Sequence, residues 1–306
     1  MKVTIIGGAG KVGAAAAFAL QMGGVVRELA IADVMEQAAA GEALDLLHGS
    51  SLCGPLTVSA GGCEVAEGSD IVVITAGLRR QPDETRLELI GRNASLFRDI
   101  LERVSEVALA DGAILVVVTN PVDILTHVAV DAGWPADRTI GTGTLLDTVR
   151  LRSLLGERLR IDPRAVDVLV LGEHGDSMVP IWSRANIDGM AVSSCPGFTD
   201  EVRAEVFQAV RGAGAEMIRL KSGAAYAIGL CVRDVVHAVA RDARRALPLS
   251  TLQRGACGIE GVCLSLPTVV GRRGIYQVIE PALSPDELDA LRVSAAVLRE
   301  TMASIG

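Results

Sequence analysis

The amino-acid sequence predicts an α/β protein, with a doubly wound parallel sheet in its first half and an α+β arrangement in its second half. Short apolar runs alternate with longer Ala-rich or amphipathic stretches, and each run is continuously apolar. Such strands, separated by helices, are typical of a parallel sheet that is covered on both faces. After about residue 142 the rhythm changes, which predicts a second unit of different architecture.

The length and composition favour two tightly packed domains. At 306 residues the chain exceeds the size at which a single hydrophobic core usually stops growing. The change of pattern near residue 142 predicts domains of residues 1–142 and 143–306, and because no low-complexity linker separates them we expect them to pack tightly. Hydrophobic residues make up 50% of the chain but aromatic residues only 3%, so Ala, Val, Leu and Ile must form most of the core.

The strand and helix patterns can be placed along the chain. In the first half, strands are predicted at residues 2–7, 28–33, 70–76 and 113–119. Helices are predicted between them at residues 11–22, 36–48 and about 86–110. In the second half we expect helices at 144–157 and 199–221, a strand at 165–172 and a strand-rich segment with a turn at 258–280. The regular alternation of a parallel sheet is therefore confined to the first half.

A capping box predicts the start of the last helix. Ser284 is a good N-cap, Pro285 fits the first helical position, and Glu287 stands three residues after the cap. The following residues give the helix one apolar face, formed by Leu288, Leu291, Ala295 and Leu298.

Charge, hydropathy and cysteine usage exclude several classes of partner. The formal net charge of −8 argues against nucleic acid, because binding to phosphates needs a basic face. We expect no membrane association, because no apolar run approaches the roughly 20 residues that span a bilayer and nothing resembles a secretion signal. The six cysteines are scattered without a C-x-x-C pair, so we expect no metal site and idle thiols in a reducing cytoplasm.

A glycine-rich segment after the first strand predicts a dinucleotide-binding loop. In "IIGGAGKVG" the residues Gly8, Gly10 and Gly13 form the pattern G-x-G-x-x-G at the start of a helix. Glycine permits a tight turn and lets the backbone approach a pyrophosphate, which the helix N-terminus attracts. We therefore expect a Rossmann fold in the first domain, although a glycine-rich turn without a ligand gives the same short pattern.

Asp33 supports this interpretation and indicates which dinucleotide binds. It ends the second predicted strand, about 20 residues after Gly13, where a carboxylate accepts hydrogen bonds from a ribose diol. The carboxylate would repel a 2′-phosphate, and the neighbouring Val34 and Met35 offer no compensating cation. The sequence therefore predicts NAD rather than NADP, with a simple turn residue at the strand end as the alternative for Asp33.

His174 is the candidate acid/base of the second half. In "LGEHGDS" it stands between glycines at the end of a predicted strand, and the chain has only four histidines. On the predicted helix "LLDTVR", Asp147 and Arg150 are three residues apart and share one face. Asp147 would orient His174, which leaves Arg150 to grip a substrate carboxylate with two hydrogen bonds. A structural histidine and an ordinary intrahelical ion pair are the alternatives.

Six motifs occur in the order found in the lactate/malate dehydrogenase family. They are "GGAGKVG", "TAGLRRQPDETR", "TNPVD", "GTGTLLDTVR", "GEHGDS" and "PTVVGRRG". The chain resembles that family nearly end to end, and the combination is much more specific than any single motif. The resemblance implies an NAD-dependent oxidoreductase that acts on small 2-hydroxy acids and assembles as a homo-oligomer, a tetramer or a dimer.

The resemblance also implies roles for individual residues. His174 would donate a proton to the keto oxygen while NADH delivers hydride, and Asp147 would support His174. Arg150 would bind the substrate carboxylate, Arg86 would polarise the carbonyl from a mobile loop, and Asn120 would contact the substrate oxygen and the nicotinamide. The chemistry agrees, because an imidazole changes charge near neutral pH and such donors stabilise a developing oxyanion.

Two positions predict oxaloacetate and (S)-malate as the substrate pair. By the family resemblance, Arg80 matches the position that faces the variable end of the substrate. Malate-type members carry Arg at this position, and lactate-type members carry Gln. A buried guanidinium facing the methyl group of pyruvate would be unpaired, at a cost of roughly 3–5 kcal/mol. Ala225 stands where lactate-type members carry Thr, which leaves room for a larger acid. Two alternatives remain open: Arg80 is a solvated loop residue, or Arg79 takes its role. Asp83 departs from the family pattern, which usually has glycine at this position.

The sequence thus predicts a cytoplasmic malate dehydrogenase of the tricarboxylic acid cycle with NAD as cofactor. The closest alternative is a lactate dehydrogenase or another 2-hydroxy-acid dehydrogenase. An NAD-dependent glycosidase would need a metal held by Cys and His, which the scattered cysteines do not supply. A non-catalytic NAD sensor would have no need of a His174–Asp147 pair together with two substrate-directed arginines.

Overall fold

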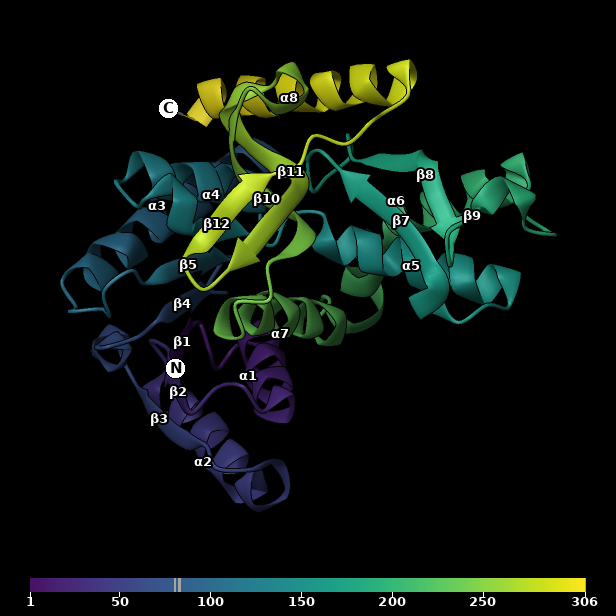
Figure 1. Ribbon diagram of the computed structural model, residues 1–306. Helices are drawn as coiled ribbons and strands as arrows, with labels where there is room; N and C mark the ends of the chain where they lie inside the picture. The colour runs from purple at the N-terminus through teal and green to yellow at the C-terminus, as the bar shows by residue number, and fades with distance from the viewer. Residues whose placement is uncertain (80, 82–83, 306) are drawn as a thin grey trace.

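The computed structural model describes residues 1–79, 81 and 84–305 of the chain (Figure 1). Within these residues the first half contributes six parallel strands to one sheet. They are β1 (Lys2–Ile6), β2 (Glu28–Ala32), β3 (Thr57–Gly61), β4 (Ile71–Ile74), β5 (Ile114–Val117) and β6 (Thr139–Gly141). Their order is β3-β2-β1-β4-β5-β6, with each neighbouring pair parallel. This is the order of a dinucleotide-binding sheet, in which the ligand crevice lies where the strand order reverses.

Helices cover both faces of this sheet. One face carries α1 (Lys11–Gly23), α2 (Glu36–Cys53) and α7 (Tyr226–Ala240), and the other carries α3 (Arg86–Ser105) and α4 (Val122–Asp131). The alternation of side chains along a strand explains the two cores, since Ile71 and Val73 of β4 pack with the first group of helices and Val72 and Ile74 with the second. All four side chains are fully buried. The strands are therefore continuously apolar because both of their faces are covered.

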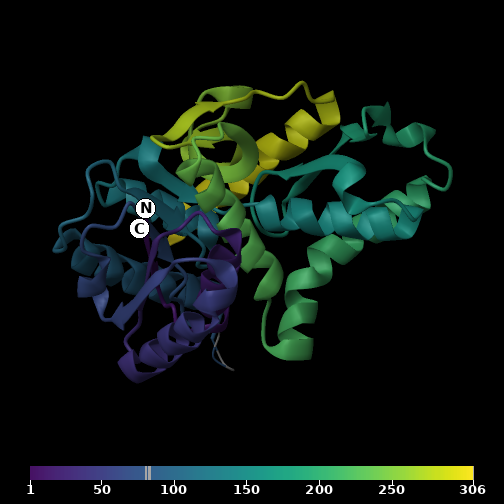
Figure 2. The same ribbon diagram turned by 60° about the horizontal axis from the view of Figure 1, so that its bottom comes forward.

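Helix α7 belongs to the second half of the chain but packs against α1 of the first half. Figure 2 shows α7 (green) between the purple and blue N-terminal half and the helices on the other side. A Cβ atom at Gly229 would lie 2.7 Å from the carbonyl oxygen of Ala15, so glycine is what allows the two helices to approach this closely. The two halves are thus joined by a tight helix contact.

Three antiparallel strands of the second half extend the same sheet beyond β6. They are β10 (Arg245–Arg254), β11 (Glu260–Gly271) and β12 (Gly274–Val278), which bring the sheet to nine strands among the described residues. At the junction Ser250 of β10 pairs with Gly141 of β6. A Cβ atom at Gly141 would lie 2.3 Å from Oγ1 of Thr126, so the crossing from parallel to antiparallel pairing needs glycine there.

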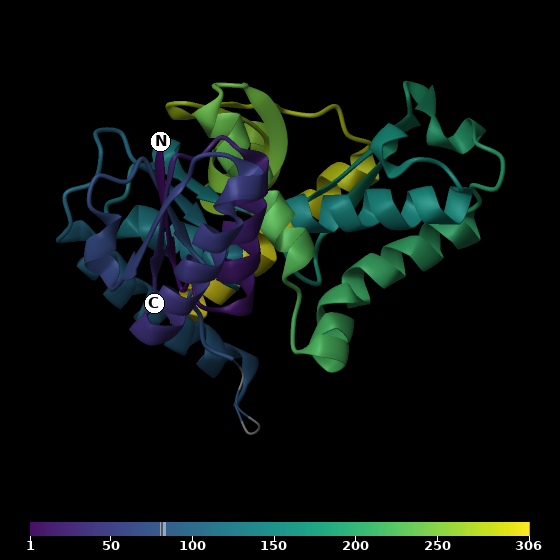
Figure 3. The same cartoon turned by 90° about the horizontal axis from the view of Figure 1, so that it is seen from below.

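The remaining elements form a smaller layer beside this sheet. Strands β7 (Val166–Leu171), β8 (Val179–Ile187) and β9 (Met190–Ala191) make an antiparallel sheet, which packs with α5 (Leu145–Leu159) and α6 (Asp200–Lys221). Helix α8 (Pro285–Ile305) packs on β8 and β11. Figure 3 shows α5 and α6 on the side of the molecule away from the N-terminal half. Short 3-10 helices occur at Cys63–Ala66, Ala136–Arg138, Pro163–Ala165, Val192–Ser194 and Ala256–Gly258.

The predicted fold class is confirmed, and most predicted elements are present within a few residues. The predicted capping box is present, since the N–H of Ser284 donates to Oε2 of Glu287 at 3.0 Å and the N–H of Glu287 donates to Oγ of Ser284 at 3.3 Å. Helix α3 ends at Ser105, earlier than predicted. The sequence analysis missed β3, β6, β8, β9, β10, α4 and α7. None of the described helices is long and apolar enough to cross a membrane.

Candidate active site

The glycine-rich loop connects β1 to α1 and exposes the N-terminus of the helix. Gly7 has a φ of 82°, and the N–H of Gly10 donates to the carbonyl oxygen of Gly7 at 3.0 Å. A Cβ atom at Gly13 would lie 2.4 Å from that same oxygen, so only glycine lets α1 pack this close to the loop. No described side chain caps α1 at Gly10, which leaves the first N–H groups of the helix available for an anion.

Asp33 lies beside this loop, directly after β2. Its carboxylate accepts hydrogen bonds from the backbone N–H groups of Ala9 at 3.1 Å and Met35 at 3.0 Å. The loop and the carboxylate therefore belong to one site, although Asp33 is 23 residues beyond Gly10 in the chain. This arrangement of glycines, helix N-terminus and carboxylate fits a dinucleotide with a free ribose diol.

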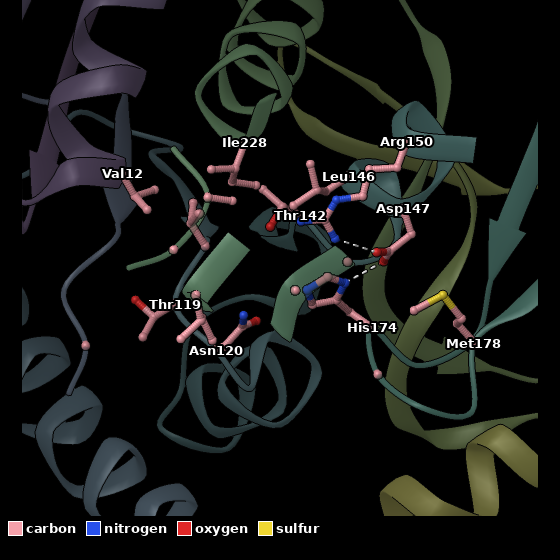
Figure 4. Close-up of a pocket in the computed structure, with 18 of the residues that line it drawn as sticks. Val12, Thr119, Asn120, Thr142, Leu146, Asp147, Arg150, His174, Met178 and Ile228 are labelled. Atoms are coloured by element: carbon pink, nitrogen blue, oxygen red, sulfur yellow. Dashed lines mark hydrogen bonds and ion pairs between the residues drawn. The ribbon is translucent and has the colours of Figure 1, made fainter. Parts of the chain in front are cut away.

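A cavity of about 410 Å³ runs from this loop toward the second half of the chain (Figure 4). Val12, in the first turn of α1, lines one end of it, and His174 lines the other. Asn120, from the loop after β5, lies between them. The cavity thus places Val12 of the glycine motif and the candidate acid/base on the walls of the same space, whereas Gly8, Gly10, Gly13 and Asp33 are not among its lining residues.

His174 and Asp147 form a buried pair in this cavity. Nδ1 of the imidazole lies 2.5 Å from Oδ2 of Asp147, whose side chain is completely buried. Because a carboxylate can only accept, Nδ1 carries the proton of this hydrogen bond. The other ring nitrogen, Nε2, points into the cavity on the side of Asn120 (Figure 4). His174 therefore has one nitrogen fixed by protein and one directed toward the space where a ligand would lie.

The surroundings of His174 raise its pKa. Burial is the largest influence and would lower the pKa, because it disfavours the charged imidazole. The charge of Asp147, its hydrogen bond and the charge of Asp123 outweigh burial, so the pKa is raised above the ordinary value of 6.5. The imidazole therefore holds its proton to a higher pH than an ordinary histidine, and it can give the proton up when a nearby acceptor develops charge.

Arg150 lies about one helical turn after Asp147 on α5 and lines the same cavity. Its Nη1 lies 3.2 Å from Oδ1 of Asp147, and the side chain is 15% exposed. Since a guanidinium has five N–H donors, this contact leaves donors for a ligand in the cavity. The structure therefore brings Asn120, Asp147, Arg150 and His174 together around one cavity.

Arg86 is not among the residues that line this cavity. It is the first residue of α3, and its side chain is 65% exposed. Its guanidinium contacts two acidic residues of the His174 loop, with Nη1 3.3 Å from Oδ2 of Asp176 and Nη2 3.6 Å from Oε1 of Glu173. To act on a substrate, Arg86 would have to leave these partners and turn toward the cavity.

Several residues around the site escaped the sequence analysis. Arg211 of α6 lines the cavity and was not predicted, whereas Arg79, which the sequence analysis left open as a substitute for Arg80, is exposed and lines the cavity as well. Glu173 is buried, and its Oε2 accepts hydrogen bonds from the N–H and hydroxyl groups of Ser177. Asp123 is buried next to the backbone of His174. The only signal for the last two was their proximity in sequence to Asn120 and His174.

The residues from which the substrate was predicted carry less information than expected. Arg80 and Asp83 lie outside the described residues. Ala225 is buried at the start of α7, but the cavity wall there is formed by its neighbours Gly223 and Ala224. Among the described residues no cluster of His, Cys, Asp and Glu could hold a metal ion.

Fold and site together define a class of nicotinamide-dependent dehydrogenase. Residues 1–141 match the family model of the lactate/malate dehydrogenase NAD-binding domain, and residues 144–305 match that of the lactate/malate dehydrogenase alpha/beta C-terminal domain. The chain belongs to the lactate/malate dehydrogenase family, and its cofactor is NAD. Both were expected from the sequence, and the expectation is confirmed.

Three proteins similar to this chain are named L-lactate dehydrogenase. The chain is 44% identical over 304 residues to L-lactate dehydrogenase of Gloeobacter violaceus, covering 97% of this chain and 92% of that one. It is 41% identical over 310 residues to L-lactate dehydrogenase 1 of Clostridium acetobutylicum, covering 99% and 98%. A crystal structure of minor L-lactate dehydrogenase from Enterococcus mundtii superposes with a TM-score of 0.95 at 33% identity, covering 100% and 98%.

These relatives show that the prediction of a malate dehydrogenase of the tricarboxylic acid cycle was wrong. The prediction relied on one loop cation, Arg80, as the partner of a second substrate carboxylate. One cation is a poor guide to the substrate, because charged residues of both signs line the cavity, among them Arg79, Arg150 and Asp176. The charge that a substrate meets is the sum over all of these groups, and a loop arginine can be offset by a neighbouring carboxylate.

Proposed function

We propose that this chain is an NAD-dependent L-lactate dehydrogenase, which interconverts pyruvate and L-lactate. The observation that carries the proposal is the agreement of names among relatives 41–44% identical over nearly the whole chain, each an L-lactate dehydrogenase. The buried His174–Asp147 pair beside a nucleotide-binding loop supports it, because reduction of a ketone needs a proton donor next to the hydride donor.

In the proposed reaction NADH supplies a hydride to the keto carbon. His174 transfers the proton from Nε2 to the keto oxygen, which balances the added electron pair and yields the hydroxyl group. Asp147 keeps Nδ1 protonated and stabilises the imidazolium before transfer. Arg150 binds the substrate carboxylate with the donors that do not contact Asp147.

Two further residues address the developing negative charge on the substrate oxygen. Asn120 borders the cavity on the side of Nε2 of His174, where its amide can donate to that oxygen. Arg86 would join it after leaving Asp176 and Glu173, and it would then add a cation while the site closes to water. Gly8, Gly10, Gly13 and Asp33, with Asn120 at the nicotinamide end, are the residues assigned to NAD.

We assign a different task to each half of the chain. Residues 1–142 would bind NAD, and residues 143–306 would bind the substrate and carry the acid/base. The homo-oligomer, tetramer or dimer, and the cytoplasmic location remain predictions. Exposed apolar side chains on α1 and α2 are available for subunit contacts, among them Phe18, Met22, Leu44, Leu47 and Leu52.

A paired substrate assay tests the proposal. The purified chain is given NADH with pyruvate or with oxaloacetate under the same conditions, and NADPH replaces NADH in a parallel series. We expect kcat/KM to be higher for pyruvate by at least about tenfold and NADH to be preferred, because Asp33 repels a 2′-phosphate. A preference for oxaloacetate of similar size would contradict the proposal, and full activity in EDTA would exclude the metal-dependent glycosidase.

A further inference from the structure

Asp123 contacts the catalytic histidine from outside the cavity. It is the second residue of α4 and does not belong to the cavity wall. Its Oδ2 accepts a hydrogen bond from the backbone N–H of His174 at 2.8 Å. The two residues are 51 positions apart, so this bond connects the first half of the chain to the loop that carries the acid/base.

The carboxyl group of Asp123 is buried, which is an unfavourable environment for an ionisable side chain. The residue is 3% exposed, and its Oδ1 has no hydrogen-bond partner among the described residues. Burial raises the pKa of Asp123 to about 6, against the opposing influence of Ser250 and of the His174 backbone. A charged carboxylate in such a place destabilises the fold unless it interacts with a cation.

The imidazole of His174, when protonated, is the cation whose charge acts on this carboxylate. The charge of Asp123 is one of the influences that raise the pKa of His174, in addition to Asp147. The other groups that face the pair are Arg150 of α5, Glu173 of the His174 loop, Ser250 of β10 and Cys263 of β11. Among these, the guanidinium opposes the imidazolium and Glu173 opposes ionisation of Asp123.

We propose that Asp123 is a positioning residue of the reaction, which fixes the peptide of His174 and supplies a second buried carboxylate that stabilises the imidazolium. The inference rests on the proposed function, because it assumes that His174 is the proton donor. Asp123 stands three residues after Asn120, so the same bond also sets the distance between the acid/base and the amide at the start of α4.

A pH effect follows from the charge of Asp123. Reduction of a keto acid needs protonated His174, so activity falls as the pH rises through the pKa of this residue. Above about pH 6 Asp123 is mostly ionised and favours the imidazolium. Removing its charge lowers the pKa of His174, and the loss of activity then begins at a lower pH.

Asp123→Asn tests the charge while it retains an oxygen for the N–H of His174. The pKa of His174 is measured by NMR titration of histidine-labelled protein, with His174→Asn identifying the signal among four histidines. We expect this pKa to fall by about half to one pH unit, and the descending limb of kcat/KM for keto-acid reduction to move by the same amount. Asp123→Ala, which also removes the hydrogen bond, should lower kcat further at every pH.

Asp131→Asn is the matched control, because it removes a carboxylate from the other end of α4 that is 65% exposed and contacts His127. It should leave both measurements unchanged. An unaltered His174 pKa in a folded Asp123→Asn protein would overturn the inference. If the variant does not fold, the wild-type His174 signal decides, since it should show a second inflection near pH 6 from Asp123, and its absence contradicts the inference. Lack of any keto-acid reduction by the wild type would instead refute the proposed function, and the NMR result would stand apart.

Discussion

His174 and Arg86 are two cationic groups proposed for one reaction, and the structure holds them in opposite ways. His174 is fixed at its ring by buried Asp147 and at its backbone by buried Asp123. Arg86 is 65% exposed and contacts Asp176, itself 81% exposed, at the rim. The comparison indicates that the proton donor is positioned in advance, whereas the arginine can exchange partners.

The energies of the two kinds of contact support this difference. An ion pair that is exposed on both sides, such as Arg86–Asp176, usually contributes about 0–1 kcal/mol, so leaving this partner costs Arg86 little. Its second partner, Glu173, is buried and lies further away, at 3.6 Å. Removing one partner of a buried pair costs about 3–5 kcal/mol, because the remaining charge is left without water or a counter-ion. Arg86, which must move in the proposed reaction, makes an exposed ion pair with Asp176 that costs little to break. His174, which must stay in place, makes a buried pair with Asp147 that costs much more to break.

The largest expected effect is that of His174→Asn, which removes the proton donor. We expect kcat/KM for pyruvate to fall by about 10³ or more, while the affinity for NADH changes little because the glycine loop is untouched. Steady-state assays of NADH oxidation measure kcat/KM, and a fluorescence titration measures the affinity for NADH. His48→Asn, at an exposed position on α2, is the control and should retain full activity. Retained turnover in the His174 variant would show that the acid/base has been misplaced.

Arg86→Gln tests the exposed member of the comparison. We expect kcat to fall by about 10², because the developing oxyanion loses a cation but keeps the proton from His174. Arg98→Gln, an exposed arginine on the same helix, should have no effect. A fall in NADH affinity without a change in kcat would assign Arg86 to the cofactor instead.

The smallest expected effect is that of Asp176→Asn on stability. Because its ion pair with Arg86 is exposed, the free energy of unfolding should change by less than about 1 kcal/mol in urea denaturation. Asp147→Asn, which breaks the buried pair with His174, should cost several times more. Equal losses in the two variants would remove the distinction between a fixed and an exchangeable cation.

Much of the fold, above all of the first half, could be predicted because its signals are local. The strand–helix alternation, the G-x-G-x-x-G turn and the Ser284 capping box each depend on neighbours in the sequence, and all are present in the structure. The missed elements lack such signals: β6 has three residues, and β10 begins with exposed Arg245 and Ala246. Their strand conformation depends on pairing with other strands, β6 with β5 and β10 with β11, and on the long-range pair of Ser250 with Gly141.

The sequence by itself determined the family, the cofactor and the fold class, because glycines, caps and apolar periodicity act through backbone geometry that is set within a few residues. Only the tertiary structure decided which side chains share a cavity, that Arg86 contacts Asp176, and that Asp123 supports His174 from another element. Burial and charge depend on every group that folding brings near. The misjudged substrate shows the consequence, since it was predicted from a single arginine without the other charged groups that line the cavity.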